Sequence, residues 1–149
     1  MIFRQLNAED KITWLPLWQE YHLSYCKLKP EITEHLWQQI LQADSKLLGF
    51  GAFSGENQLL GFAICVIHPN TRFLTDACYL EDLFVSPQYQ GQGVATFLIK
   101  QIYRFAEQKN YNRVYWISRA DNSKALSLYQ KLAFQTDFIQ FRVDLPLEE

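Results

Sequence analysis

The sequence lacks the patterns that indicate nucleic-acid binding, a disulfide framework or a membrane span. No run of Lys or Arg occurs and the net charge is −2, so we expect no direct contact with DNA or RNA. The three cysteines contain no Cys-x-x-Cys pair, which argues against disulfides and structural zinc. The longest aliphatic run, residues 62–67, is too short to cross a bilayer. These absences predict a cytoplasmic protein without membrane insertion.

Metal-ligand spacing is missing as well. His22, His35 and His68 are scattered along the chain, with no potential ligand at metal-binding spacing. Surface or core imidazoles are the simpler interpretation, and no metal site is predicted.

What the chain has is enough apolar material for one well-packed core. Hydrophobic residues make up 48% of the 149 positions and charged residues 20%, a composition typical of globular proteins. The length suits one domain better than two, so we predict a single domain over residues 1–149. Neither repeats nor low-complexity segments interrupt it.

Hydrophobic periodicity predicts alternating strands and helices of the α/β (α+β) class, with one mixed sheet flanked by helices. Asn7 or Asp10 is suited to cap the first helix. The expected order is β-α-α-β-β-β-α-β-α-β. Strands are expected at 2–6, 47–53, 59–67, 79–85, 113–118 and 138–145, and helices after residue 10, after Pro30, at 93–108 and around 125–132.

The stretch from Tyr79 to Ala95 carries the strongest functional signal. A strand ends at Ser86-Pro87 and a turn containing Gly91 and Gly93 opens the next helix. Free N–H groups at such a helix start suit an anion, although a tight connection without a ligand has the same appearance. The GKS or GKT ending of a nucleotide P-loop is absent, and Thr96 replaces the third glycine of the dinucleotide fingerprint.

Two sequence blocks resemble the GCN5-related N-acetyltransferase (GNAT) superfamily. Gln90, Gly93 and Ala95 fill its acetyl-CoA signature, and a later block places Asn122, Ala125, Tyr129, Lys131 and Ala133-Phe134 at the family's spacing. The chain is most similar to the branch that acetylates polyamines, small amines and histone-type lysines. Two positions depart from the pattern. Gln90 replaces the commoner Arg, and Ala133 replaces a Gly expected in a left-handed helix C-cap, at a cost of about 1 kcal/mol.

The resemblance implies acetyl-CoA as co-substrate and names the residues that hold it. Backbone groups of Leu83, Phe84 and Val85 would pair with pantetheine like an added strand, and one N–H would polarise the thioester carbonyl. The amides of the glycine turn would hold the pyrophosphate, and Asn122 would contact the pantetheine arm unless it is only a helix N-cap. The remaining predicted cofactor-binding residues are Gln90, Gly91, Gln92, Gly93, Val94, Ala95, Thr96 and Lys131.

The resemblance to GNAT enzymes also implies two catalytic residues, Glu81 and Tyr129. Acetyl transfer needs a neutral amine, so a base is useful. Glu81 and Asp82 are adjacent, and strand alternation predicts that only one faces the thioester. The resemblance assigns the base to Glu81, acting through a water, against the alternative of a solvated or ion-paired residue. It assigns protonation of the CoA thiolate to Tyr129, against the alternative of a core tyrosine.

The acceptor site is expected between the first two helices and the late strands. Glu20, Tyr21 and Glu81 are predicted to bind a cationic amine there. The aromatic stripe formed by Trp14, Trp18, Tyr21 and Tyr25 has a second interpretation as plain core, which we favour.

The predicted function is direct transfer of an acetyl group from acetyl-CoA to a primary amine of a polyamine, small molecule or lysine. A non-catalytic acyl-CoA-binding sensor and a Rossmann-like nucleotide module are the alternatives. The alternating apolar residues of the last predicted strand, 138–145, also suggest a homodimer through that strand.

Overall fold

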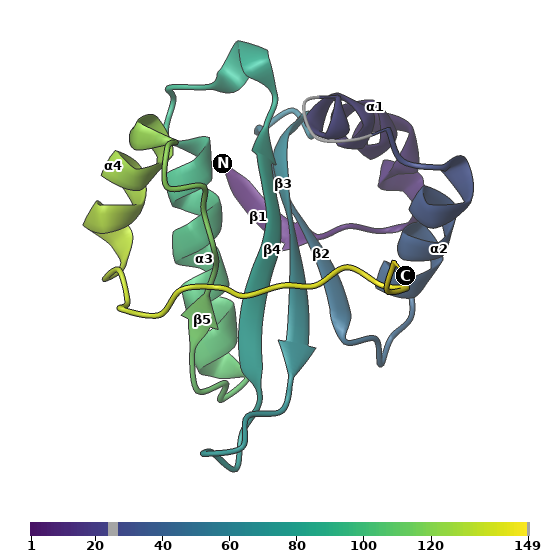
Figure 1. Cartoon of the computed structure of the whole chain (residues 1–149). Coiled ribbons are helices and arrows are strands. Elements are labelled where there is room, and N and C mark those ends of the chain that lie inside the picture. Colours follow the sequence, from purple (N-terminus) through teal and green to yellow (C-terminus); the bar gives the residue numbers. More distant parts are fainter. Residues whose placement is uncertain (24–26, 149) are drawn as a thin grey trace. The chain divides into compact units, whose positions relative to one another are not determined.

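The computed structural model of the chain describes residues 1–23 and 27–148, which fall into two compact units, Met1–Ile117 and Ser118–Glu149. The first unit holds a mixed sheet with the strand order β1-β2-β3-β4-β5 (Figure 1). Its strands are β1 (Ile2–Gln5), β2 (Leu47–Phe53), β3 (Leu59–His68), β4 (Ala77–Val85) and β5 (Val114–Tyr115). The predicted fold class is confirmed, and so is the predicted hairpin, because β2 pairs with β3.

Two helices, α1 (Lys11–His22) and α2 (Pro30–Ile40), pack on one face of the sheet. Before α1 lies a short 3-10 helix, η1 (Ala8–Asp10), closed by a capping box in which the Asn7 side chain accepts from Glu9 N and Asp10 accepts from Asn7 N. Trp14 and Trp18 are almost fully buried against Phe62 of β3. The aromatic stripe is therefore core for these two tryptophans, while Tyr25 lies outside the described residues.

The other face is covered by α3 (Val94–Gln108), as Figure 1 shows. Its apolar side packs Val94 and Leu98 against the sheet, together with Leu83 and Val85 of β4. The helix begins directly after the glycine turn, which a second 3-10 helix, η2 (Pro87–Tyr89), connects to β4. The predicted strand, turn and helix are all present.

The last strand of this sheet is short. β5 runs parallel to β4 and pairs with it only through Cys78↔Val114 and Tyr79↔Tyr115, whereas the sequence predicted a strand over 113–118. Trp116 stacks near Tyr103 of α3, with ring centroids 6.5 Å apart. By alternation, Tyr115 therefore points away from α3, toward the face that carries α1 and α2.

The second unit contains α4 (Ser123–Leu132), close to where a helix was predicted. Two predictions for this unit are wrong. Residues 138–145 form no strand, because a strand needs a hydrogen-bonded neighbour and none is assigned in this segment. Ala133 is extended, with φ −153° and ψ 170°, so it avoids the left-handed conformation that would have strained it.

No helix among residues 1–23 and 27–148 is both long enough and apolar enough to cross a membrane. The same residues contain no cluster of three or more His, Cys, Asp or Glu side chains arranged for a metal ion.

Candidate active site

The turn before α3 exposes backbone N–H groups. Gly91 and Gly93 have positive φ values of 77° and 83°, and a Cβ added at either would meet no atom within 4 Å. The side chain of Gln90 closes the turn, because its Nε2 donates to the Val85 carbonyl at 3.2 Å. No side chain caps the first turn of α3 within the described chain. The turn thus combines unused donors, open space and the positive end of a helix dipole, a combination suited to a pyrophosphate.

The strand that leads into this turn has an open edge. β3 pairs with β4 along its whole length, but β5 pairs only with Cys78 and Tyr79 within the described residues. The edge of β4 from Leu80 to Val85 that faces away from β3 therefore has no partner strand among the described residues of the first unit. Leu83, Phe84 and Val85, predicted to hold pantetheine, lie on this edge, where an extended chain can add as a strand.

Gly61 lets β3 and β4 approach closely beside this edge. A Cβ at this position would lie 2.8 Å from the Phe84 carbonyl oxygen and 3.2 Å from Val94 Cγ1. The missing side chain therefore fixes where the Phe84–Val85 backbone lies relative to the start of α3. The sequence showed only a glycine inside a strand, with no sign of this contact.

A β-bulge separates the two neighbouring acids of β4. Ile64 pairs with Asp82 and the next residue, Cys65, pairs with Leu80, so Glu81 is the extra residue without a partner. Glu81 is exposed and Asp82 is half-buried. The predicted alternation of these side chains does not hold here, because a bulge shifts the phase of the strand. In a regular strand, positions 79 and 82 would point to opposite faces. Because of the bulge, Tyr79 and Asp82 share the face that carries α1.

Asp82 is an acid whose pKa is raised by its surroundings. Burial raises its pKa to about 6, a hydrogen bond from the Tyr21 hydroxyl opposes the shift, and the charge of Glu81 adds to it. Tyr21 comes from α1, and its ring centroid lies 5.5 Å from that of Phe84. An acid with a pKa near neutrality beside an open strand edge is a candidate general base.

The predicted acceptor residues are only partly brought together. Tyr21 reaches Asp82 directly and Glu81 is its neighbour, whereas Glu20 is exposed on α1. Sequence reasoning did not single out Asp82 as a candidate base. It had no signal for it, because the bulge and the contact with Tyr21 arise only when the sheet and α1 pack together.

The second unit carries the other predicted residues on α4. Asn122 is the N-cap, and its Oδ1 accepts from Ala125 N at 3.3 Å, which leaves Nδ2 as the atom for a pantetheine contact. Tyr129 is half-buried in the second turn, and Lys131 is exposed in the last turn. The helix-cap interpretation of Asn122 is thus correct, and the catalytic and cofactor roles of these three residues stay predictions.

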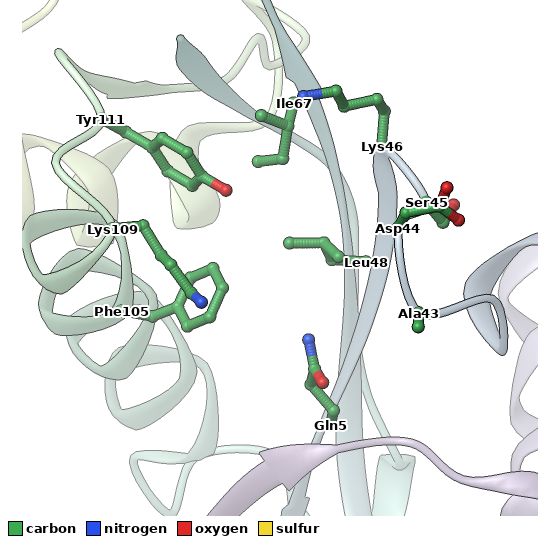
Figure 2. A pocket seen from close by; sticks show the side chains of 10 residues that line it. All are labelled: Gln5, Ala43, Asp44, Ser45, Lys46, Leu48, Ile67, Phe105, Lys109 and Tyr111. Atoms are coloured by element: carbon green, nitrogen blue, oxygen red, sulfur yellow. The ribbon is translucent and has the colours of Figure 1, made fainter. Parts of the chain in front are cut away.

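A separate cavity of about 290 Å³ lies between the loop that precedes β2 and the C-terminal end of α3 (Figure 2). Lys109, Phe105 and Tyr111 line it from one side, with Gln5 and Leu48 from β1 and β2. None of the predicted catalytic or cofactor residues lines it. The strand edge and the glycine turn, rather than this hollow, remain the candidate site.

Comparison with known proteins agrees with this geometry. The model of the acetyltransferase (GNAT) family matches residues 10–134, which include the bulge, the glycine turn and α4. The chain belongs to the GNAT acetyltransferase family. It is therefore an acetyl-CoA-dependent N-acetyltransferase, and the resemblance inferred from Gln90, Gly93, Ala95 and the Asn122 block is confirmed.

Two curated GNAT relatives illustrate the range of similarity. The D-amino-acid N-acetyltransferase HPA3 of Saccharomyces cerevisiae is 27% identical over 144 residues, which cover 95% of this chain and 89% of that protein. Thialysine N-epsilon-acetyltransferase of Mus musculus is 40% identical over 57 residues, which cover 38% of this chain and 34% of that protein.

Solved structures show the same fold. A probable acetyltransferase superposes with a TM-score of 0.85 at 23% identity, covering 100% of this chain and 99% of that chain. AAC(6')-Iy, solved with the bisubstrate analogue CoA-S-monomethyl-acetylneamine, gives a TM-score of 0.79 at 24% identity and covers 96% of this chain and 97% of that chain. These likenesses establish the GNAT fold of the chain.

Proposed function

We propose that this GNAT enzyme transfers the acetyl group of acetyl-CoA directly to a primary amine of a small molecule, in a ternary complex. The observation that carries the proposal is the acidic pair at the bulge of β4, on the strand whose open edge leads to the glycine turn. In this arrangement the cofactor arm and a proton acceptor would have adjacent positions on one strand. The named activities of HPA3 and of the thialysine enzyme support a small amine as acceptor.

The acid pair would supply the base. An amine with a pKa of about 10.4 is almost fully protonated at neutral pH and must lose its proton before it attacks. Asp82 has a pKa of about 6, so near neutral pH it is ionised yet basic enough to take a proton through a water. Glu81 would bind the cationic amine and tune Asp82. This assignment, with Asp82 as the base and Glu81 as the amine-binding residue, differs from the sequence-based prediction, which made Glu81 the base.

The other predicted residues would take part in the remaining steps of the reaction. As the N–C bond forms and the C–S bond breaks, the departing thiolate would take a proton from the Tyr129 hydroxyl. Backbone N–H groups of residues 83–85 would stabilise the charge on the thioester oxygen. Asn122 and Lys131 would contact the cofactor, while the amides of residues 91–96 would hold its pyrophosphate.

The test combines binding with turnover. We expect CoA and acetyl-CoA to raise the melting temperature of the protein and NAD and ATP to leave it unchanged, since a ligand at 100 times its Kd adds about 2.7 kcal/mol. A thiol-release assay over a panel of amines should then show turnover that falls at least about tenfold in Tyr129→Phe, with KM for acetyl-CoA little changed.

Three outcomes would contradict the proposal. Stabilisation by CoA without thiol release for any amine would favour the acyl-CoA sensor, and full activity of Tyr129→Phe would remove the role of that hydroxyl. Stabilisation by NAD alone would favour the nucleotide module.

A further inference from the structure

We propose that Tyr79 stacks on an aromatic ring of the acceptor, so that the acceptor is an arylalkylamine, in which a short alkyl arm joins an aromatic ring to the reacting amine. The inference rests on the proposed function, since it adds a second contact to the amine that Glu81 and Asp82 bind. It is carried by a pair of tyrosines, Tyr79 and Tyr115, on the sheet face that carries α1.

Tyr79 lies one row of paired residues away from the acid pair. Ile64 pairs with Asp82, and Val66, two residues further along β3, pairs with Tyr79. Rows that are two residues apart on a strand are separated by roughly 7 Å. An amine bound at the acids and a ring bound on Tyr79 must span that separation, which an ethylamine arm and the ring that it carries together cover.

Tyr115 supports Tyr79 from the side that faces away from Asp82. Its ring centroid lies 4.9 Å from that of Tyr79, and its hydroxyl oxygen lies 2.6 Å from His68 Nε2. His68 pairs with Ala77 of β4, so the hydroxyl of Tyr115, a β5 residue, reaches across β4 where that strand carries only a methyl group. The hydrogen bond and the small neighbour thus hold the Tyr115 ring against Tyr79.

This hydrogen bond does not depend on the charge of His68. His68 Nδ1 lies 2.8 Å from the carbonyl oxygen of Pro69, which can only accept, so Nδ1 donates. In the neutral ring Nε2 then accepts from the Tyr115 hydroxyl, and in the imidazolium it donates to the same oxygen. Tyr115 keeps its place in both states, and His68 and Tyr115 are positioning residues for Tyr79.

The tyrosine pair keeps surface for a ligand. Tyr79 is half-buried and Tyr115 is 37% exposed. Val66, the partner of Tyr79 on β3, is half-buried as well, so the surface beside Tyr79 is apolar. A saturated group bound there gains only from buried area, whereas an aromatic ring also gains from the geometry of stacked rings. The pair therefore favours an aromatic ring over an aliphatic group of the same size.

The charges at this end of the sheet disfavour a second ammonium group, which could also stack on a tyrosine. Asp76 is already paired with Lys46 at 3.2 Å. Arg113 precedes Tyr115 by two residues, and its guanidinium carbon lies 5.6 Å from the ring centroid of Phe73, so a permanent positive charge lies beyond the tyrosine pair. A second ammonium group would meet this charge without a carboxylate to bind, and an uncharged ring avoids both penalties.

The test compares phenethylamine, cyclohexylethylamine and cadaverine as acceptors in the thiol-release assay. The first two differ only in the aromaticity of the ring, and cadaverine carries a second ammonium group instead. With wild-type protein we expect the lowest KM for phenethylamine, a KM several-fold higher for cyclohexylethylamine, and one at least about tenfold higher for cadaverine.

Variants of the tyrosine pair assign the preference to Tyr79. Tyr79→Leu should raise the KM for phenethylamine several-fold, with kcat little changed and cyclohexylethylamine within about twofold. Tyr115→Phe and His68→Ala break the same hydrogen bond, so each should reduce the ratio of the two KM values by a similar and smaller factor. Tyr103→Leu, which removes a half-buried aromatic residue from α3 on the other face, is the control and should leave the ratio unchanged.

Equal KM values for phenethylamine and cyclohexylethylamine with wild-type protein, or a ratio that Tyr79→Leu leaves unchanged, would overturn the proposal. A lower KM for cadaverine than for phenethylamine would do the same. If Tyr79→Leu fails to fold, as its melting temperature would show, Tyr115→Phe and His68→Ala decide the question. Calorimetric titration of the same amines into the CoA-saturated protein gives the comparison without turnover. Absence of turnover for every amine defeats the proposed function, while the titrations still decide whether Tyr79 binds an aromatic ring.

Discussion

Asp82 and Glu81 show how neighbouring residues of the same chemical type acquire different properties. Asp82 is half-buried and bonded to Tyr21, while Glu81, one position earlier, is exposed. The negative charge of Glu81 makes ionisation of Asp82 harder, and the Tyr21 hydroxyl makes it easier. Burial raises the pKa of Asp82, and Tyr21 and Glu81, which can be changed separately, adjust that pKa in opposite directions.

We predict a pH–rate profile with an acidic limb near pH 6. The base must be ionised, so kcat/KM should rise as pH passes the pKa of Asp82, which is about 6. Glu81→Gln removes a negative charge and should move the limb to lower pH. Tyr21→Phe removes a hydrogen bond to the ionised form and should move it to higher pH. Asp82→Asn should abolish the limb and most of the activity.

Shifts of the same sign in Glu81→Gln and Tyr21→Phe would contradict this account. If the limb persists in Asp82→Asn and disappears in Glu81→Gln, the base is Glu81, as the sequence predicted.

At this scale the sequence predicted which residues form the site, and both those residues and their roles stay predictions. Glu81, Tyr21 and the glycines were identified from spacing and resemblance. The pKa of Asp82 depends on burial under α1, and the position of Tyr115 depends on pairing with β4, and both arise from packing between segments that are distant in the sequence. Local periodicity contains no information about either.

Among the elements, the start of α3 depends on a backbone conformation that few residues tolerate. Gly93 is its N-cap, with φ 83°, and it connects the turn to a helix whose first N–H groups have no side-chain cap in the described chain. No atom lies within 4 Å of a Cβ added at Gly93, so a larger residue would strain the backbone at positive φ but would meet no steric clash.

We predict that Gly93→Ala weakens CoA binding more than it destabilises the fold. A Cβ at positive φ costs about 1 kcal/mol, which the turn can relieve by turning its amides away from the pyrophosphate. The Kd for CoA, measured by calorimetry, should rise several-fold, with a drop of only a few degrees in melting temperature. Gly55→Ala, also in open space but without a positive φ, should change neither value.

If Gly93→Ala bound CoA like the wild type, the turn would not be the anion site. The starts of α2 and α3 were predictable because Pro30 is the first residue of α2 and Gly93 is the N-cap of α3, and apolar periodicity marked the length of α3. Two strands were not predicted correctly. β5 is shorter than the apolar run suggests, and residues 138–145 form none, because strand formation depends on a partner as well as on alternation.

For the whole molecule, β5 is an edge of the sheet in the first unit. An unpaired strand edge tends to bind another strand, and residues 138–145 keep the alternating apolar pattern that such pairing requires.

We therefore predict a homodimer at micromolar concentration, formed through residues 138–145, and light scattering measures this directly. Phe141→Lys, which places a charge in the middle of the segment, should shift the mass toward the monomer, while Lys124→Glu on exposed α4 should not. A monomeric mass for the wild-type protein would contradict the prediction. The single domain over 1–149 and the cytoplasmic location likewise stay predictions.

The bulge at Glu81 has a consequence for the whole sheet. If residues 79–85 formed a regular strand without a bulge, Tyr79 and Glu81 would share one face, while Asp82 and Phe84 would point toward α3. The acid would then lie among the apolar residues of that helix, and Tyr21 would have nothing to bond. The bulge thus lets one strand carry Tyr79 and the ionisable Asp82 on the same face, while Leu83 and Val85 pack against α3 on the other.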